Sequence, residues 1–337
     1  MRRPRYPGRH PRAFHLKDKE RQPERYGADV ARVLAAGRTP AGMHRAIMVD
    51  EILRVLDPQP GQVAVDCTLG YGGHARAMLE RLQPGGRLIG LDVDPIELPR
   101  TVDRLRAAGY GDDVFEAERA TFAGLPQVLA RHGLAAVDVL VADLGVSSMQ
   151  FDDPERGFTF KHEGPFDMRM NPSRGAPASD LVARATVPVV ASWLRDHADE
   201  PQADAIAAAI AGRTFATTTA FAEAVRAAVA LAVPRRDDEQ ARTVRRAFQA
   251  VRIAVNDELG ALDAVLRHLP QCLAPGGRAA ILTFHSGEDR RVKKALQAGV
   301  RDGTYVAVSA EVTRASAAEV HANPRAASAK LRWARRA

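Results

Sequence analysis

Short apolar runs alternate along the chain with segments in which apolar residues recur at steps of three and four. Such runs predict buried strands, and the segments between them predict helices. The predicted strands cover residues 62–66, 87–92, 137–143 and 279–284, and the predicted helices cover residues 48–56, 74–82 and 98–108. The alternation of strand and helix indicates an α/β fold with a parallel, doubly wound sheet.

The stretch from about residue 175 to 235 has a different pattern. It is rich in alanine at helical spacing and lacks strand-like runs, and its clearest predicted helices cover residues 203–211 and 221–233. Beyond it, apolar residues recur at steps of three and four from Phe248 to Leu269, which predicts one long amphipathic helix. The Pro-Gly-Gly turn at residues 275–277 is expected to end this connection before the last strand.

These patterns divide the chain into three predicted parts. Residues 1–40 are rich in Pro and Arg with little apolar periodicity, so we expect a basic N-terminal extension there. Residues 41–174 and 240–337 are expected to form the domain that contains the sheet. Residues 175–239 are expected to form an all-helical insertion domain.

The bulk composition limits the class of protein. With 337 residues, 46% of them hydrophobic, the chain can build a sizeable core. No apolar run is long enough to span a membrane and the Arg-rich start lacks an apolar signal core, so we expect a cytoplasmic protein without a membrane partner. Cys67 and Cys272 are the only cysteines and have no metal-ligand spacing around them, so no metal site is predicted.

The formal charge of +7 is concentrated at the two ends of the chain. Residues 1–26 hold nine Lys or Arg against three acids, and the last fourteen residues hold five Lys or Arg and no acid. Basic ends on a balanced body favour contacts with a nucleic-acid phosphate backbone. Tails that only keep the protein in solution are the alternative.

A glycine-rich loop follows the first predicted strand. The sequence Gly70-Tyr-Gly-Gly-His-Ala75 fits the G-x-G-x-x-A pattern of nucleotide-binding loops, and Asp92 ends the next predicted strand, where an acid binds ribose hydroxyls. Asp66, directly before the loop, would repel a pyrophosphate but tolerate the cationic methionine end of S-adenosylmethionine. The loop therefore favours S-adenosylmethionine over NAD, and a glycine-rich turn without a ligand is the remaining alternative.

Six further motifs resemble one family in their order and spacing. They are Asp143-Leu-Gly-Val-Ser-Ser148, Asp153-Pro-Glu-Arg-Gly-Phe158, Gly164-Pro-Phe-Asp-Met-Arg-Met170, Phe248-Gln-Ala-Val-Arg-Ile-Ala-Val-Asn256, Phe284-His-Ser-Gly-Glu-Asp-Arg290 and Asn323-Pro-Arg325. Over roughly residues 44–337 the chain resembles the small-subunit ribosomal RNA cytosine-N4 methyltransferase family, also called RsmH or MraW. Six motifs in order are far more specific than any one of them.

The resemblance implies a class I S-adenosylmethionine-dependent methyltransferase, Rossmann-like, with an inserted helical domain. Members of the family methylate the N4 amine of a decoding-site cytidine in 16S ribosomal RNA, so the implied partner is the small ribosomal subunit, while the oligomeric state stays open. Together with Asp66 and Gly70 from the loop itself, the cofactor contacts carried over position by position are Gly72, Gly73, His74, Asp92, Phe122, Asp143 and Gln150.

Methylation of a cytosine amine sets requirements that the loop after residue 143 meets. The amine lone pair is delocalised into the ring, so the site must position the amine and accept its proton. Asp143 is the predicted acceptor, and Ser147, Ser148 and Gln150 would read the Watson–Crick edge. An extracted base would stack on Phe151 or Phe158. Cys67 is expected to fill space in the core, because methylation at an exocyclic nitrogen needs no covalent adduct.

Several other residues near this loop have two interpretations each. His285, with Ser286, either accepts a proton and orients the substrate or braces its own loop. Arg156 is expected to form an internal ion-pair network with Asp153 and Glu155, with an RNA phosphate as its alternative partner. Three arginines of the predicted long helix are expected to face RNA: Arg245, Arg246 and Arg252. For Arg245 and Arg246, a solvated helix face is the alternative.

The chain also departs from the family pattern. The family has Leu where Gly287 stands and Pro where Ala46 stands, and the basic stretch around residues 326–328 is thinned. Several of these departures lie where RNA would be held, and none of them touches the cofactor set. They keep two alternatives open: a paralogue that methylates another nucleic-acid amine, and a ribosome-assembly factor that binds RNA without turnover.

Overall fold

The computed structural model describes residues 46–230 and 237–337. The predicted extension at residues 1–40 and the end of the helix predicted at 221–233 lie outside these residues. Met48–Arg314 and Ser328–Ala337 form one compact unit, which contains the sheet and all of the features considered below. A second unit includes Ala315–Ala327 and contains α15 (Ala317–Ala322), which the side chain of Ser316 caps; the short 3-10 helix η4 spans Pro324–Ser328.

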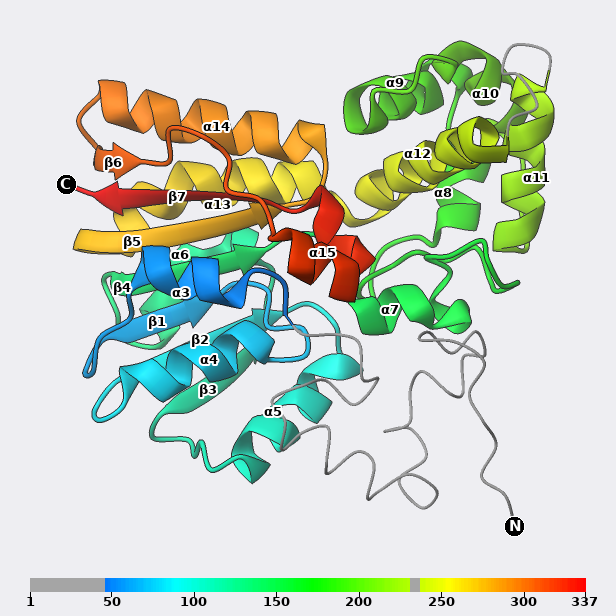
Figure 1. Ribbon diagram of the computed structural model, residues 1–337. Coiled ribbons are helices and arrows are strands. Elements are labelled where there is room, and N and C mark those ends of the chain that lie inside the picture. The colour runs from blue at the N-terminus through cyan, green and yellow to red at the C-terminus, as the bar shows by residue number, and fades with distance from the viewer. Residues whose placement is uncertain (1–45, 231–236) are drawn as a thin grey trace. The chain divides into compact units, whose positions relative to one another are not determined.

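Seven strands form a single sheet in the order β3-β2-β1-β4-β5-β7-β6 (Figure 1). The strands are β1 (Val63–Asp66), β2 (Arg87–Asp92), β3 (Phe115–Arg119), β4 (Val137–Asp143), β5 (Leu273–Thr283), β6 (Tyr305–Val308) and β7 (Lys330–Arg336). The first five pair in parallel, whereas β7 runs antiparallel to both β5 and β6. The doubly wound α/β fold is confirmed, and the four strands that the sequence predicted pair in parallel; the antiparallel β7 was not among them. The charged strands β3 and β7 lack the apolar runs that predict a buried strand.

Helices cover both faces of this sheet (Figure 1). One face carries α3 (Val49–Leu56), α4 (Gly73–Leu82) and α5 (Glu97–Ala107), and the other carries α6 (Leu125–Arg131), α13 (Glu258–Cys272) and α14 (Ser286–Arg301). On the second face, aliphatic strand residues such as Ile89, Leu140 and Ile281 pack against Leu262 and Leu296. Parallel strands buried on both faces leave only their ends for polar chemistry.

A second hydrophobic core lies in the helical region. Its helices are α8 (Ala178–Arg184), α9 (Val187–Ala198), α10 (Ala203–Ile210), α11 (Thr218–Val229) and α12 (Asp237–Asn256). Phe221 stacks on Phe166 with ring centroids 4.3 Å apart and meets Phe248 edge-on at 5.2 Å. Phe158 and Phe166 precede residue 175 and still belong to this core. The domain boundaries drawn at 174/175 and 239/240 stay a prediction.

The long helix predicted through residues 248–269 is in fact two helices. Helix α12 ends at Asn256 and α13 begins at Glu258, because Asp257 adopts a left-handed conformation with φ 49°. The Asn256 side chain accepts the N–H of Met170 and donates to the carbonyl of Met168, both at 2.8 Å. These bonds to a loop more than 80 residues away turn the chain where the apolar periodicity continues.

Residues 275–277 do not precede the last predicted strand as expected but belong to it. They fall inside β5, where the register against β4 shifts between the pairs Val137–Leu273 and Val139–Arg278. The Pro-Gly-Gly sequence therefore forms a bulge in a strand that begins at Leu273.

No helix in the described part of the chain is both long and apolar enough to cross a membrane.

Candidate active site

Three strands of the sheet end in aspartate at the same edge. Asp66 ends β1, Asp92 ends β2 and Asp143 ends β4, and β1 lies between the other two strands. The chain leaves β1 toward β2 on one side and reaches β4 on the other. Such a reversal of strand order opens a crevice at the carboxyl ends of the strands, which is where open α/β sheets bind ligands.

The carboxylate of Asp66 is buried and only half satisfied. Oδ1 accepts the N–H of Thr68 at 3.0 Å, whereas Oδ2 has no hydrogen-bond partner among the described residues. Burial raises the pKa of Asp66 to about 6, against 3.8 for an ordinary aspartate. A buried carboxylate oxygen without a donor is costly, so its presence here indicates that a cation or donor completes it.

The glycine-rich loop between β1 and α4 is held by α5 and by β2. The N–H of Gly70 donates to Asp92 Oδ2 at 2.8 Å, and Thr101 Oγ1 donates to the carbonyl of Gly70 at 2.5 Å. Gly72 has φ +84°, and a Cβ there would lie 2.9 Å from Thr101 Cγ2. Only glycine fits at that position. Gly73 then begins α4, and His74 is buried in the first turn of that helix.

The carboxylate of Asp92 binds two backbone N–H groups and keeps acceptor capacity. Its Oδ2 accepts from Gly70 and its Oδ1 accepts the N–H of Asp94 at 2.9 Å, and each oxygen keeps a further lone pair. Burial raises the pKa of Asp92, and the backbone donors from Asp94 and Gly70 partly offset this rise. Phe122, in the short 3-10 helix η2 (Phe122–Gly124) after β3, is half-buried against the sheet core.

Asp143 faces the glycine-rich loop across the crevice. Its backbone N–H donates to Thr68 Oγ1 at 2.6 Å, and its Oδ2 lies 3.5 Å from His74 Nε2. Its Oδ1 is buried without a hydrogen-bond partner in the described part of the chain. Two carboxylates from neighbouring strands thus each present one unpartnered oxygen at this edge.

The loop after β4 is built around helix α7 (Ser148–Asp152). The side chain of Ser147 accepts the N–H of Gln150, and Gln150 Oε1 accepts the N–H of Ser147 at 3.0 Å, which forms a capping box. Gln150 Nε2 donates to Asp94 Oδ2 at 2.7 Å. Ser147 and Gln150 therefore shape the loop themselves, whereas half-buried Ser148 begins the helix.

Arg156, which ends the 3-10 helix η3 (Pro154–Arg156), has an internal role with an unexpected partner. Its Nη1 lies 2.8 Å from Asp94 Oδ2, and both side chains are buried. The predicted internal role is therefore present, but Asp153 and Glu155 are not the acids that pair with Arg156. The only signal in the sequence was the Asp-Val-Asp spacing at residues 92–94, which does not indicate a partner 62 residues away.

His285 caps helix α14. Its Nδ1 accepts the N–H of Glu288 at 3.4 Å and its Nε2 lies 3.1 Å from Glu288 Oε1. Although burial opposes it, the hydrogen bond from His285 lowers the pKa of Glu288. Nδ1 thus serves the helix cap and Nε2 lies beside the Glu288 carboxylate, as the loop-bracing interpretation expects. Ser286 donates to Asp199 on the helical region at 2.7 Å. A catalytic role of His285 stays a prediction.

Two further residues, Phe158 and Arg252, are less available to RNA than the sequence predicted. Phe158 is buried in the helical core, so it does not offer a ring to an extracted base; Phe151 is only partly buried. Arg252 pairs with Glu258 through two hydrogen bonds of 2.8 and 2.9 Å. Cys67 is buried beneath the edge, as expected of a space-filling residue, and burial raises the pKa of its thiol.

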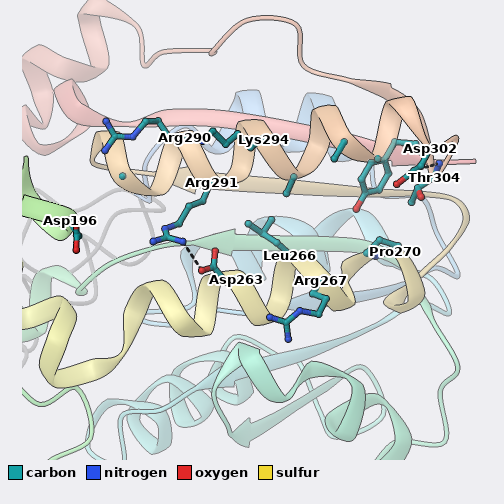
Figure 2. A pocket seen from close by; sticks show the side chains of 15 residues that line it. Asp196, Asp263, Leu266, Arg267, Pro270, Arg290, Arg291, Lys294, Asp302 and Thr304 are labelled. Atoms are coloured by element: carbon teal, nitrogen blue, oxygen red, sulfur yellow. Dashed lines mark hydrogen bonds and ion pairs between the residues drawn. The ribbon is translucent and has the colours of Figure 1, made fainter. Parts of the chain in front are cut away.

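A surface groove of about 620 Å³ lies between α13 and α14, and Figure 2 shows the side chains that line it. Arg291 pairs with Asp263 across it at 2.6 Å, and Arg267 and Lys294 lie farther along. None of the predicted cofactor residues lines this groove. Since charges of both signs line it and the unpartnered carboxylates lie elsewhere, the groove is not the candidate active site.

The strand order, with its antiparallel β7, and the acids that end β1, β2 and β4 define a class I S-adenosylmethionine-dependent methyltransferase. More narrowly, the chain belongs to the MraW methylase family, whose model matches residues 41–337. The resemblance drawn from the six motifs is confirmed.

Individual relatives match nearly the whole chain. The protein named ribosomal RNA small subunit methyltransferase H 2 of Alkaliphilus metalliredigens is 47% identical over 341 residues, which cover 99% of this chain and 97% of the relative. The protein named ribosomal RNA small subunit methyltransferase H 1 of Lachnoclostridium phytofermentans is 46% identical, with 99% and 92% covered. A solved putative methyltransferase from Streptococcus mutans in complex with SAH is 10% identical with a TM-score of 0.40 over 86% of this chain and 96% of that one, a likeness too slight to bear on the site.

The residues at the edge fit the cofactor of this class. Asp66 Oδ2 and Asp143 Oδ1 are each buried without a hydrogen-bond partner among the described residues, and both complement a cationic ligand. Asp92 keeps lone pairs for ribose hydroxyls, and Phe122 offers an apolar ring for adenine. The individual contacts of these residues stay predictions.

Proposed function

We propose that this protein methylates the exocyclic N4 amine of a cytidine in the decoding region of 16S ribosomal RNA, in the cytoplasm. The names of the relatives, small-subunit ribosomal RNA methyltransferases, support the proposal that the substrate is 16S ribosomal RNA. The observation that carries the reaction type is Asp143, a carboxylate at the end of β4 with an unpartnered buried oxygen, beside a second such carboxylate on β1. This pair suits a cationic methyl donor and a neutral amine nucleophile.

The chain's residues divide the work of binding the cofactor. S-adenosylmethionine supplies an electrophilic methyl group on a sulfonium. Asp66 and the glycine-rich loop hold the methionine end, and Asp92 binds the ribose hydroxyls while its bond to Gly70 keeps the loop in place. His74 neighbours Asp143 and maintains the orientation of that carboxylate.

Asp143 then assists the transfer itself. A hydrogen bond from the N4 amine to the carboxylate would localise the nitrogen lone pair for attack on the methyl carbon. S-adenosylmethionine would supply that carbon and keep the electron pair of the broken carbon–sulfur bond, and Asp143 would accept one N4 proton or pass it to water. General base assistance of this kind contributes about 10²- to 10⁴-fold in rate.

The loop after β4 receives the base. A cytosine must leave its stack for its amine to reach the sheet edge. Ser148, which is half-buried, and the backbone carbonyls of residues 144–148 would bind its polar edge, and partly buried Phe151 would stack on it. Since Cys67 is buried with a raised thiol pKa, it does not serve as a nucleophile toward the ring.

Methyl transfer from labelled S-adenosylmethionine to small ribosomal subunits tests this proposal. We expect label in 16S ribosomal RNA and N4-methylcytidine as the product nucleoside by mass spectrometry, with incorporation by an Asp143→Asn variant slower by about 10²-fold or more. If another methylated nucleoside were found, the methyltransferase activity would be supported but cytidine would not be its target. Binding of the cofactor without incorporation into any ribosomal RNA would favour the non-catalytic assembly factor.

A further inference from the structure

The buried carboxylate of Asp94 lies between the predicted ribose-binding turn and the loop that follows β4. Its side chain is 1% exposed, and that of Arg156, its partner, is 9% exposed. Oδ2 accepts from both Arg156 Nη1 at 2.8 Å and Gln150 Nε2 at 2.7 Å. Oδ1 accepts the N–H of Ile96 at 2.8 Å. Both oxygens are thus satisfied within the protein, and none of these bonds requires a ligand.

On one side, Asp94 is connected to the cofactor residues. Its backbone N–H donates to Asp92 Oδ1, and Asp92 Oδ2 accepts the N–H of Gly70 in the glycine-rich loop. A change in the position of the Asp92 carboxylate on binding ribose therefore acts directly on the turn that carries Asp94.

On the other side, Arg156 connects Asp94 to the loop at residues 147–170. Its Nη2 donates to the carbonyls of Met170 at 2.8 Å and Arg169 at 3.2 Å. Met168, directly before Arg169, has φ 62°, a left-handed conformation that a methionine rarely adopts. The N–H of Met168 donates to the carbonyl of Arg156 at 3.2 Å, so the same arginine holds this strained residue at its backbone too.

The energetics of burial make this connection stiff. Separation of a buried ion pair leaves each charge without its partner in a medium that solvates it poorly. Arg156 also has five donors in one plane, and three described acceptors fix that plane. The loop therefore moves together with Asp94 rather than apart from it.

We propose that Asp94 is a positioning residue that couples occupancy of the cofactor site to the order of the loop at residues 147–170 through Arg156 and Gln150. The proposal rests on the proposed function in one respect, that this loop receives the substrate. The coupling itself requires only the cofactor. By thermodynamic linkage, a cofactor that orders the loop strengthens the binding of the substrate, and the substrate strengthens the binding of the cofactor by the same factor.

Hydrogen exchange measured by mass spectrometry, with and without saturating S-adenosylhomocysteine, tests the coupling without any RNA. In the wild type we expect the ligand to slow exchange both in residues 90–97 and in residues 147–170. In the double variant Asp94→Asn/Arg156→Gln, which leaves no unpaired buried charge, we expect slowing in residues 90–97 only. Arg156→Lys, which keeps the charge but loses the planar fork, should weaken the protection of residues 147–170.

A matched control separates coupling from loss of stability. Arg332 is buried and Asp289 is partly buried, with 7% and 16% of their side chains exposed, and they form an ion pair between β7 and α14. The Asp289→Asn/Arg332→Gln variant should lower the melting temperature comparably and still show protection of residues 147–170. Protection that survives in Asp94→Asn/Arg156→Gln, or that is missing in the wild type, overturns the proposal. So does a failure of that variant to bind S-adenosylhomocysteine, since the pair would then hold the cofactor turn itself.

Binding of RNA supplies a second readout. With any RNA that the wild type methylates, we expect the Kd for RNA at saturating S-adenosylhomocysteine to rise about fivefold or more in Arg156→Lys, while the Kd for S-adenosylhomocysteine measured without RNA changes little. If S-adenosylhomocysteine strengthened RNA binding equally in the wild type and in Arg156→Lys, the coupling would be contradicted. If small-subunit RNA proves not to be a substrate, the hydrogen-exchange result still stands, so the two proposals fail separately.

Discussion

The carboxyl edge of the sheet and the core of the helical region differ in what they bury. The edge holds aspartates on three strands, two of which have an oxygen without a partner among the described residues. The helical core holds stacked and edge-on phenylalanines, and several alanines let its helices approach closely. One region is incompletely satisfied in its polar groups, whereas the other is filled with apolar groups.

This difference separates function from stability. Because burial raises the pKa of Asp66 from 3.8 to about 6, its ionised form opposes folding by about 3 kcal/mol. The phenylalanine cluster contributes in the opposite direction, since each buried ring removes a large apolar area from water. We therefore expect substitutions at the edge to change activity more than stability, and substitutions in the helical core to do the reverse.

The largest effect is expected at Asp143. Asp143→Asn removes the proton acceptor but keeps the shape of the side chain, so kcat should fall about 10²- to 10⁴-fold in a methyl-transfer assay. The melting temperature should stay the same or rise, because a half-satisfied carboxylate becomes neutral. Wild-type turnover by this variant would remove Asp143 from the mechanism.

The helical core should respond in its stability. Phe221→Ala deletes a ring that contacts three other phenylalanines and should lower the free energy of unfolding by about 3–5 kcal/mol in urea titrations. Phe122→Ala is the matched control at the sheet edge, where the half-buried ring should cost less stability and more cofactor affinity. Equal losses of stability at the two positions would erase the contrast between the regions.

Asp92 tests the cofactor side of the edge. Asp92→Ala removes the acceptors for ribose hydroxyls and for the N–H groups of Gly70 and Asp94, so the affinity for S-adenosylhomocysteine should fall about 10- to 100-fold in calorimetry. The variant should still unfold cooperatively. Unchanged affinity would show that the ribose binds elsewhere.

The smallest expected effect is a pH dependence set by Asp66. Its folded-state pKa of about 6 lies above 3.8, so the penalty to folding is absent at low pH and complete once the pH exceeds about 6. A cationic ligand that requires the ionised form gains affinity over the same window, about tenfold from pH 5 to pH 7. In Asp66→Asn the pH profile of S-adenosylmethionine binding should be flat and the free protein more stable at pH 7. The same slope in that variant would assign the titration to another group.

Much of the edge follows from local sequence. The strands that end in Asp66, Asp92 and Asp143 are visible as apolar runs that stop at an acid. The glycines from Gly70 to Gly73 predict a loop whose backbone a ligand can approach closely. These features depend on neighbours within a few residues. The parallel order of the first strands then brings the three acids to one edge, so their proximity was predictable as soon as the strands were.

The sequence by itself determined the alternation of strands and helices, the acids at the strand ends and the family to which the chain belongs. Only the tertiary structure decided that Asp257 divides one periodic segment into two helices, that β7 runs antiparallel and that Gln150 and Arg156 bind Asp94. The physical reason is range. Periodicity records which face of a segment is buried, whereas a hydrogen bond or ion pair between residues 56 to 88 positions apart depends on where the whole fold places them.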